Sequence, residues 1–302
     1  MSGIRRIGRI LKSKPTIEGA GVFLNRAFGY YEASLMDPFL LLDDFRSKDP
    51  EHFLPGFPWH PHRGIETVTY MLEGKVEHGD SLDNRGVISP GDVQWMTAGS
   101  GIIHQEMPKG DSDGFMGGFQ LWANLPSMKK MTDPKYRDVK AEQIPSVKTG
   151  EGALIKIICG DVNGIKGPVS DIAIEPEYLD VTVPSDTTFK HGTKSDHTVF
   201  AYVIEGSACF DDKYQENHKV VSPRYFDFDK KNGIDNGHLV VFEPGDEINV
   251  RTRDKPVRFL LVSGKPLNEP IAWYGPIVMN TDEELDTAFE EYRNGSFIKK
   301  RS

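Results

Sequence analysis

The sequence predicts an all-β protein made of two jelly-roll barrels in tandem, with one short helix near its end. Three observations favour this class. Hydrophobic and polar residues alternate from about residue 20 to about residue 265, glycine and proline punctuate that stretch, and two parts of it resemble each other. A period of two is typical of strands with one buried face, and closely spaced turn residues are typical of many short strands.

Length and composition exclude several classes of protein. A chain of 302 residues is long enough for about two domains and needs no disulfide or zinc to fold. Its two cysteines, Cys159 and Cys209, form no Cys-x-x-Cys motif, which argues against a thiolate metal site. The net charge of −9 repels phosphate backbones, so we expect no direct nucleic-acid partner. No run of 18 apolar residues occurs, so we expect no membrane partner either.

The first strands follow a basic N-terminus. Basic residues and isoleucines are interleaved in residues 4–14, which we interpret as an opening β-strand with a basic flank rather than a transit peptide. The next clear strand covers Gly21–Phe28.

An internal repeat organises the rest of the chain. Thr67–Gly74 resembles Val199–Gly206, and downstream Ser89–Asp92 resembles Glu243–Asp246. Each copy reads as a strand with a Glu-Gly turn, then a Pro-Gly-Asp turn, then more strands. This is the pattern of a double-sheet barrel used twice, a bicupin made of two double-stranded β-helix barrels.

The repeat sets the expected domains. We predict an N-terminal cupin at 1–140 that holds a metal site and a C-terminal cupin at 150–302 that holds none, with an insertion at 211–238. The second range includes a helix at Thr281–Arg293, where Thr281 and Glu284 form a capping box and Gly295 is a stop signal.

Two short motifs in the first half indicate a metal site. His60 and His62 lie at i and i+2, so on a strand both imidazoles point to the same face. His104 and Glu106 repeat this spacing with an imidazole and a carboxylate. Two strands of one barrel could therefore aim four ligands at one ion. Because the second half has Gly192 and Lys194 where the first has the two histidines, we expect one metal per chain.

Glu66 is a rival carboxylate. It lies an even number of residues from His60 and His62, so the same strand face would carry it. It could therefore be a ligand, or it could hold a histidine ring from outside the ligand set. Other pocket candidates are weaker. Gln120 and Trp122 share one strand face just after the second metal motif, and Phe57 and Trp59 precede the first ligand. We expect the aromatic residues among these to belong to the core. Arg63 and Asp44 could pair near the mouth, and we expect His52, His78, His218 and His238 to be solvated.

The strings HPHRGIETVTYMLEG (60–74), SPGDVQWMTAGSGIIHQEMP (89–108) and FQLWANLPSMKKMTDPKY (119–136) resemble the pirin family. The stretch HGDSLDNRGVISPGD (78–92) resembles the bacterial branch of that family more than the animal one. The resemblance implies a bicupin with one iron held by His60, His62, His104 and Glu106. Fe(II) is the expected metal, and three imidazoles with a carboxylate also suit Mn, Co, Ni or Cu, with Zn as a replacement.

The resemblance also implies an activity. Some pirins are quercetin 2,3-dioxygenases, in which O₂ opens the central ring of a flavonol. Glu106 would then be both ligand and catalytic proton acceptor. An alternative from another class is an iron-dependent, redox-sensitive co-regulator that binds transcription factors or a metabolic enzyme without turnover. A third is a cupin that has lost catalysis. We expect a cytoplasmic protein, or a nuclear one if the source is eukaryotic.

Overall fold

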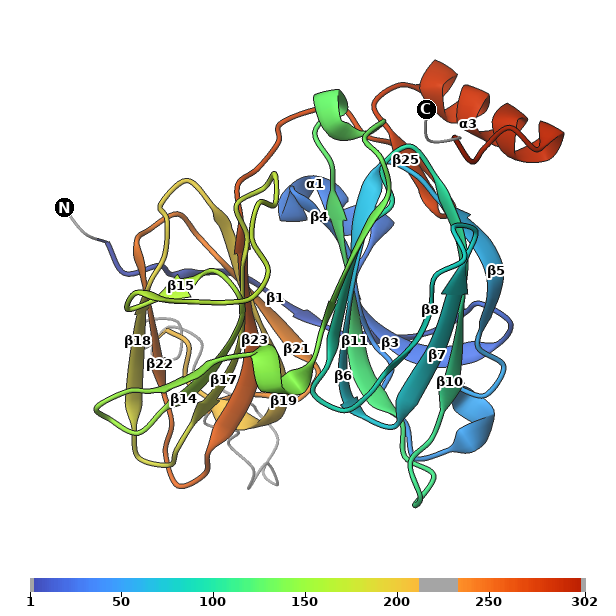
Figure 1. The fold of residues 1–302 in the computed structure, drawn as a ribbon. Helices are drawn as coiled ribbons and strands as arrows, with labels where there is room; N and C mark the ends of the chain where they lie inside the picture. Colours follow the sequence, from blue (N-terminus) through green and yellow to red (C-terminus); the bar gives the residue numbers. More distant parts are fainter. Residues whose placement is uncertain (1–2, 212–232, 300–302) are drawn as a thin grey trace, which may run out of the picture. The chain divides into compact units, whose positions relative to one another are not determined.

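β-Strands dominate the computed structural model, which describes residues 3–211 and 233–299, and this confirms the predicted all-β class (Figure 1). The strands form sheets with antiparallel pairing between neighbours. Most of the predicted insertion at 211–238, and His218 with it, lies outside the described residues. No helix in the described ranges is long and apolar enough to cross a bilayer.

The chain divides into two units that do not follow its order. The N-terminal barrel unit comprises Lys14–Ile144, Asp171–Ile174 and the chain from Leu267 onward. The C-terminal barrel unit comprises Pro145–Ser170, Glu175–Pro266 and the chain up to Ser13. The predicted ranges 1–140 and 150–302 differ from these units at both ends. An alternating pattern shows that a segment is a strand but not which sheet edge it joins.

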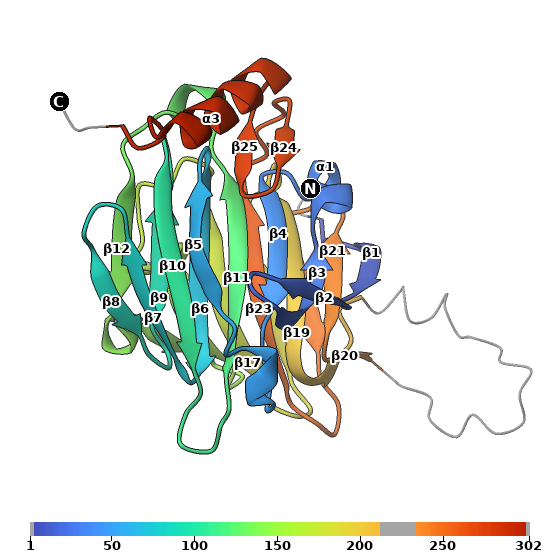
Figure 2. The same ribbon diagram turned by 90° about the vertical axis from the view of Figure 1, so that its right-hand side faces the viewer.

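The barrel of the N-terminal barrel unit is built from two sheets. Its larger sheet has the order β12-β9-β6-β11-β4-β3-β2, and the smaller has the order β5-β10-β7-β8 (Figure 2). The larger sheet consists of β2 (Lys14–Glu18), β3 (Val22–Phe28), β4 (Phe39–Asp44), β6 (Ile65–Glu73), β9 (Val93–Thr97), β11 (Gly117–Asn124) and β12 (Lys135–Val139). The smaller consists of β5 (Phe57–His62), β7 (Lys75–Asp80), β8 (Arg85–Ile88) and β10 (Ile102–Lys109).

The last part of the chain packs on this same unit. It contains the paired strands β24 (Ala272–Tyr274) and β25 (Ile277–Met279), followed by helix α3 (Asp282–Asn294). A second short helix, α1 (Ala33–Met36), precedes β4. Val278 is fully buried in a cluster with Ile65, Met96 and Ile102 of the barrel. The core of this barrel therefore combines side chains from the first half of the chain with one from its last part.

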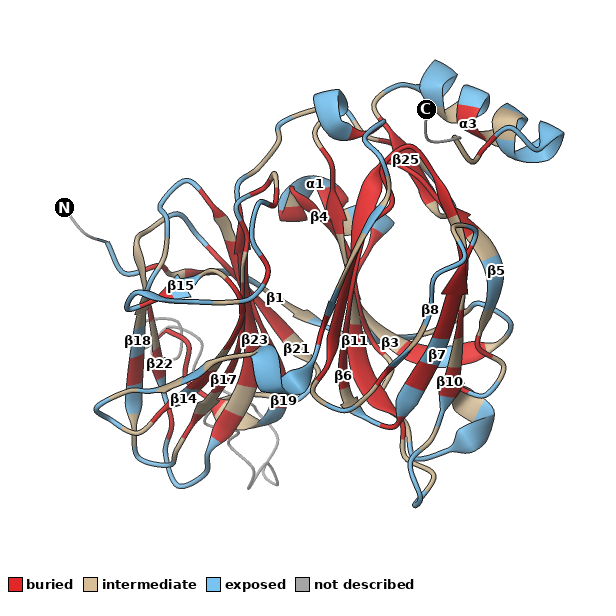
Figure 3. Cartoon of the chain, viewed as in Figure 1, coloured by how far each residue is buried: buried red, intermediate tan, exposed pale blue. Residues whose placement is uncertain are grey.

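Helix α3 begins and ends where the sequence predicts. Thr281 is its N-cap, its hydroxyl accepts from the Glu284 backbone N–H, and Gly295 follows with φ +79. Ala288 is buried, and Leu285 and Phe289 pack with it against β25 and Ile103 of β10. The opposite face of α3 is exposed (Figure 3).

The C-terminal barrel unit has one large sheet with the order β1-β21-β19-β23-β17-β14-β13 and β20 paired to β19. Its strands are β1 (Ile7–Lys12), β13 (Ser146–Lys148), β14 (Leu154–Cys159), β17 (Glu177–Val183), β19 (Thr198–Ala208), β20 (Ile234–Asp235), β21 (His238–Phe242) and β23 (Val257–Gly264). Two further pairs are β15 (Asp161–Val162) with β16 (Ile165–Lys166), and β18 (Thr188–Gly192) with β22 (Glu247–Arg251). Its core is apolar and includes Phe189, Phe210 and Phe259.

The repeated Glu-Gly turns adopt matching backbone conformations in the two units. Gly74 after β6 has φ +72, and Gly206 in β19 has φ +73. A Cβ at Gly206 would lie 2.0 Å from the Pro256 carbonyl oxygen, and one at Gly74 would lie 2.8 Å from Met116 Sδ. Both positions thus require glycine for its backbone freedom and for its lack of a side chain.

Candidate metal centre

Three histidines from two neighbouring strands meet at one point. Strands β5 and β10 pair so that His60 and His104 are direct cross-strand partners. One ring nitrogen from each of His60, His62 and His104 lies within 4.8 Å of the other two. His62 and His104 are buried and His60 is half-buried. The i, i+2 spacing read from the sequence therefore does bring the two imidazoles of β5 together with that of β10.

Backbone carbonyls fix the orientation of the two β5 histidines. His60 Nδ1 lies 2.8 Å from the Pro58 carbonyl oxygen, and His62 Nδ1 lies 3.1 Å from that of Pro276. A carbonyl oxygen only accepts, so both Nδ1 atoms carry the hydrogen. Burial lowers the pKa of both rings, which keeps them neutral and leaves each Nε2 with a free lone pair. The two Nε2 atoms are 3.1 Å apart.

His104 has no hydrogen-bond partner for either ring nitrogen, although both are buried. Burial also lowers its pKa well below the ordinary value, so the ring is a neutral donor. A buried polar atom without a partner is destabilising, and coordination to a cation satisfies it. Together with the facing Nε2 atoms of His60 and His62, this fits a divalent metal ion bound between the three rings.

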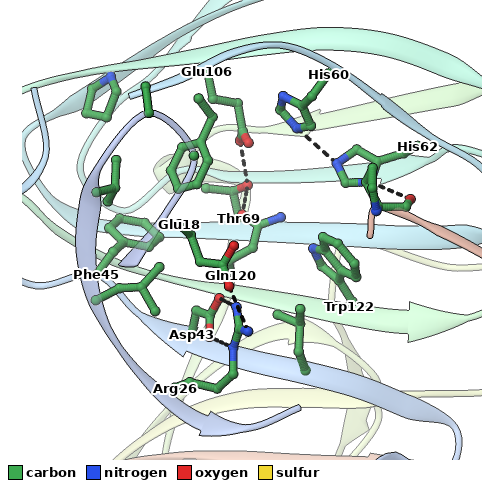
Figure 4. Close-up of a pocket in the computed structure, with 18 of the residues that line it drawn as sticks. Glu18, Arg26, Asp43, Phe45, His60, His62, Thr69, Glu106, Gln120 and Trp122 are labelled. Carbon is green, nitrogen blue, oxygen red and sulfur yellow. Dashed lines mark hydrogen bonds and ion pairs between the residues drawn. The ribbon is translucent and has the colours of Figure 1, made fainter. Parts of the chain in front are cut away.

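Glu106, the predicted fourth ligand, lies outside the three mutually close nitrogens. Its carboxyl group is 3.3 Å from the hydroxyl of Thr69, which is also 2.7 Å from Gln120 Oε1 (Figure 4). Burial raises the pKa of Glu106 to about 7. The roles of Glu106 as ligand and proton acceptor stay predictions.

Glu66, the rival carboxylate, is engaged elsewhere. It accepts hydrogen bonds from Thr97 Oγ1 at 2.6 Å and from Trp95 Nε1 at 3.2 Å, and burial raises its pKa. Like Glu106, it is not among the three mutually close donors. Its hydrogen bonds tie β6 to β9 inside the larger sheet.

Two of the three histidines, His60 and His62, open onto a cavity of about 790 Å³ in the N-terminal barrel unit. His60, His62 and Glu106 form part of its wall (Figure 4). Most of the remaining lining is apolar or aromatic: Val22, Leu24, Leu41, Phe45, Phe53, Phe57, Trp59, Val76, Met116, Trp122 and Trp273. A cavity of this size and character is typical of a site for a drug-sized organic ligand.

One charged cluster lines the same cavity. Arg26 donates to both carboxylate oxygens of Asp43, at 2.8 and 2.7 Å, and pairs with Glu18 at 2.9 Å. Asp43 is buried, whereas Glu18 is partly exposed. One cation therefore faces two carboxylates here, and nothing in the sequence pattern indicated that these residues would share the cavity.

The expectation that three aromatic residues belong to the core is wrong, because Phe57, Trp59 and Trp122 line the cavity, together with the pocket candidate Gln120. The Trp122 ring meets that of His62 edge-on, with 5.0 Å between centroids, and the Trp59 side chain is more than half exposed. The alternation of side chains along a strand shows which of them share a face. It does not show whether other side chains fill the space in front of that face.

Two further expectations are wrong. His78 is buried rather than solvated: its Nε2 is 2.9 Å from Gln94 Nε2 and its ring stacks on Tyr136. Arg63 does not pair with Asp44, which is held by Arg46 at 2.6 Å. It is buried and pairs with Glu291 of helix α3. Both errors concern partners from elements that are distant in the sequence.

Comparison with known proteins agrees with this geometry. The profile of the family described as Pirin matches residues 21–123, and that of the Pirin C-terminal cupin domain matches residues 178–298. A pirin-like protein of Caulobacter vibrioides is 41% identical, with 97% of this chain and 99% of the relative covered. Human pirin is 37% identical, with 97% and 94% covered. A crystal structure of quercetin 2,3-dioxygenase from Acinetobacter baumannii matches with a TM-score of 0.84 at 30% identity, covering 98% and 99%.

Proposed function

Because the chain belongs to the pirin family, we propose that it is a metal-dependent dioxygenase that opens the central ring of flavonols such as quercetin. The observation that carries the proposal is a cluster of three neutral imidazoles, two of which, His60 and His62, lie in the wall of a mostly apolar cavity. The name of the Acinetobacter neighbour supports the same reaction class. We propose Fe(II) as the native metal, and nitrogen donors of this kind also accept Mn, Co, Ni, Cu or Zn.

The cavity suits a flat polyphenol. Its aromatic and aliphatic walls can cover the faces of a fused ring system, and its polar groups are confined to a few places. Trp122 lies against His62 and would flank a ring system that reaches the metal. Thr69 and Gln120 provide a hydroxyl and an amide beside Glu106 for hydrogen bonds to substrate oxygens.

The residues of this chain would have two roles: the histidines would bind the metal, and Glu106 would accept one proton. His60, His62 and His104 hold the ion through their free ring nitrogens. A bound divalent metal would supply a positive charge that favours the deprotonated hydroxyl of the flavonol. Glu106, with a pKa of about 7 in the absence of a cation, would accept that proton at its carboxylate. The apolar walls exclude water from the reacting ring.

The proposal is tested by anaerobic reconstitution with Fe(II), followed by quercetin and air. Loss of flavonol absorbance and release of carbon monoxide are measured. His60→Ala should abolish turnover. His191→Ala is the matched control, because His191 pairs with Glu177 in the C-terminal barrel unit, and it should leave turnover unchanged. Full activity of His60→Ala would contradict the proposal.

The alternative, a metal-dependent co-regulator that binds other proteins, makes a different prediction for the same experiment. It expects stoichiometric iron binding with no consumption of quercetin. An open, apolar-lined cavity beside the metal ligands favours turnover over this alternative, because a binding-only role needs no such space.

A further inference from the structure

The two histidines of β5 are oriented by different parts of the chain. The hydrogen bond of His60 Nδ1 goes to Pro58 within the same strand. That of His62 Nδ1 goes to Pro276, 214 positions later, in the turn between β24 and β25. We name residues 267–299 the C-terminal segment. The ring orientation of His62 thus depends on where this segment lies against the barrel.

Arg63, the neighbour of His62 in the chain, attaches the end of helix α3 and the residues that follow it to the barrel. Its buried guanidinium donates to the carbonyl oxygens of Ser100 and Phe297, at 2.7 and 2.9 Å, and pairs with Glu291 at 2.7 Å. It also lies 4.2 Å from the centre of the Phe297 ring. One side chain therefore joins the β5–β6 turn, the loop before β10 and the end of α3.

Lys130 attaches strand β25 of the C-terminal segment to the barrel. Its Nζ is buried and donates to the Gly64 carbonyl, the Asn124 side chain and the Val278 carbonyl, at 2.9, 2.7 and 3.0 Å. The Gly64 carbonyl lies just after His62, and the Val278 carbonyl lies in β25. Lys130 therefore joins the backbone of the β5–β6 turn to that of β25. The approach is close: a Cβ at Gly64, which has φ +77, would lie 1.9 Å from the Val278 carbonyl oxygen.

We propose that Lys130 and Glu291 are positioning residues for the metal, acting through the C-terminal segment and the Pro276 carbonyl on His62. By holding β25 and α3 against the β5–β6 turn, they keep the Pro276 oxygen where it receives the His62 Nδ1 hydrogen. His62 Nε2 then stays directed at the ion. This inference rests on the metal site of the proposed function but does not depend on which substrate, if any, is turned over.

The test measures Co(II) affinity by competition with a chelator, together with the visible absorption bands of bound Co(II). Lys130→Met and Glu291→Gln leave all three histidines in place. Groups that orient a metal ligand from outside the ligand set typically contribute about 10- to 100-fold to metal affinity. We expect both variants to bind Co(II) at least roughly 10-fold more weakly and with shifted bands.

Lys140→Met is the matched control. Lys140 also contacts a carbonyl and a buried side chain of the same unit, those of Val87 and Asp92, and neither contact involves the C-terminal segment. It should keep the wild-type Co(II) affinity and bands. A loss of thermal stability in Lys130→Met and Glu291→Gln, with affinity and bands unchanged, would overturn the proposal and leave a purely structural role.

A second variant, Gly275→Ala, tests the proposal independently in case Lys130→Met does not fold. In Gly275→Ala the new methyl group meets no atom within 4 Å, so the change acts only through the backbone, where φ is +55. It strains the turn that presents Pro276 and should also weaken Co(II) binding. If the wild-type protein binds metal but leaves quercetin unchanged, the proposed dioxygenase fails while this inference stands.

Discussion

His60 and His62 face each other through their Nε2 atoms, 3.1 Å apart, while each Nδ1 is held by a backbone carbonyl. Both rings are neutral because burial lowers their pKa values, so two lone pairs point toward each other. Such an arrangement is unfavourable unless a cation lies between them. The folded chain therefore presents a pair of donors suited to bind one ion.

Removal of metal should therefore destabilise the protein. At a free metal concentration 100 times Kd, binding to the native state adds about 3 kcal/mol to the free energy of unfolding. We expect the melting temperature to fall when Fe(II) or Co(II) is replaced by a chelator. His104→Leu is the control, since it removes the unpartnered ring nitrogens and should melt at the same temperature with and without metal. Equal melting temperatures for loaded and metal-free wild type would contradict the prediction.

Glu106→Gln should separate metal binding from turnover. The amide keeps the size of the carboxyl but cannot accept the substrate proton at neutral pH, so we expect kcat to fall by about 100-fold or more. The three histidines remain, so iron should still bind in stoichiometric amount. Iron content and the rate of quercetin loss are measured on the same sample. An unchanged kcat would remove the proposed proton-accepting role.

Lys130 should give the protein an alkaline rise in stability. Burial lowers the pKa of its ammonium to about 7, against 10.5 in the unfolded chain. Between these values the unfolded state binds more protons than the native state, so the free energy of unfolding increases as pH rises from about 7 to about 10.5. Urea titrations at pH 7 and pH 10 measure it, and the rise should be smaller in Lys130→Met. A rise of the same size in both proteins would be the contrary result.

The carboxylates on Arg26 should differ in their effect on stability. Arg26→Met leaves Asp43 buried without its cation, which should lower the free energy of unfolding by about 3 kcal/mol. Glu18→Gln removes the exposed partner of the same guanidinium and should change it by less than about 1 kcal/mol. Urea unfolding of the two variants measures the difference. Similar losses would show that the buried pair has no special role.

Much of the candidate site could be read from the sequence. His60 and His62 are two positions apart, as are His104 and Glu106, and a strand turns every second side chain to the same face. Once the alternating pattern indicates strands, the convergence of the three histidines depends only on β5 pairing with β10. The repeated Glu-Gly turns likewise require only local backbone geometry at Gly74 and Gly206.

Other features depend on contacts between distant segments. The partner of Arg63 is Glu291, the acceptor for His62 Nδ1 is Pro276, and His78 is buried against Tyr136. No spacing rule relates these positions, because they meet only after sheets and helix have packed. Trp59 and Trp122 line a cavity for the same reason. Whether a side chain faces a cavity or the core depends on whether other side chains, from distant segments, fill the space in front of it.

Alternation and turns are local properties of the chain, so the all-β class, the duplicated barrel and the faces on which the candidate ligands lie follow from the order of the residues. Three features follow only from packing: the first strand joins the C-terminal barrel unit, the C-terminal segment joins the N-terminal one, and the Pro276 carbonyl of that segment orients His62. The physical reason is that sheet edges and buried donors select their partners by shape and unsatisfied hydrogen bonds, which appear only when the core has formed.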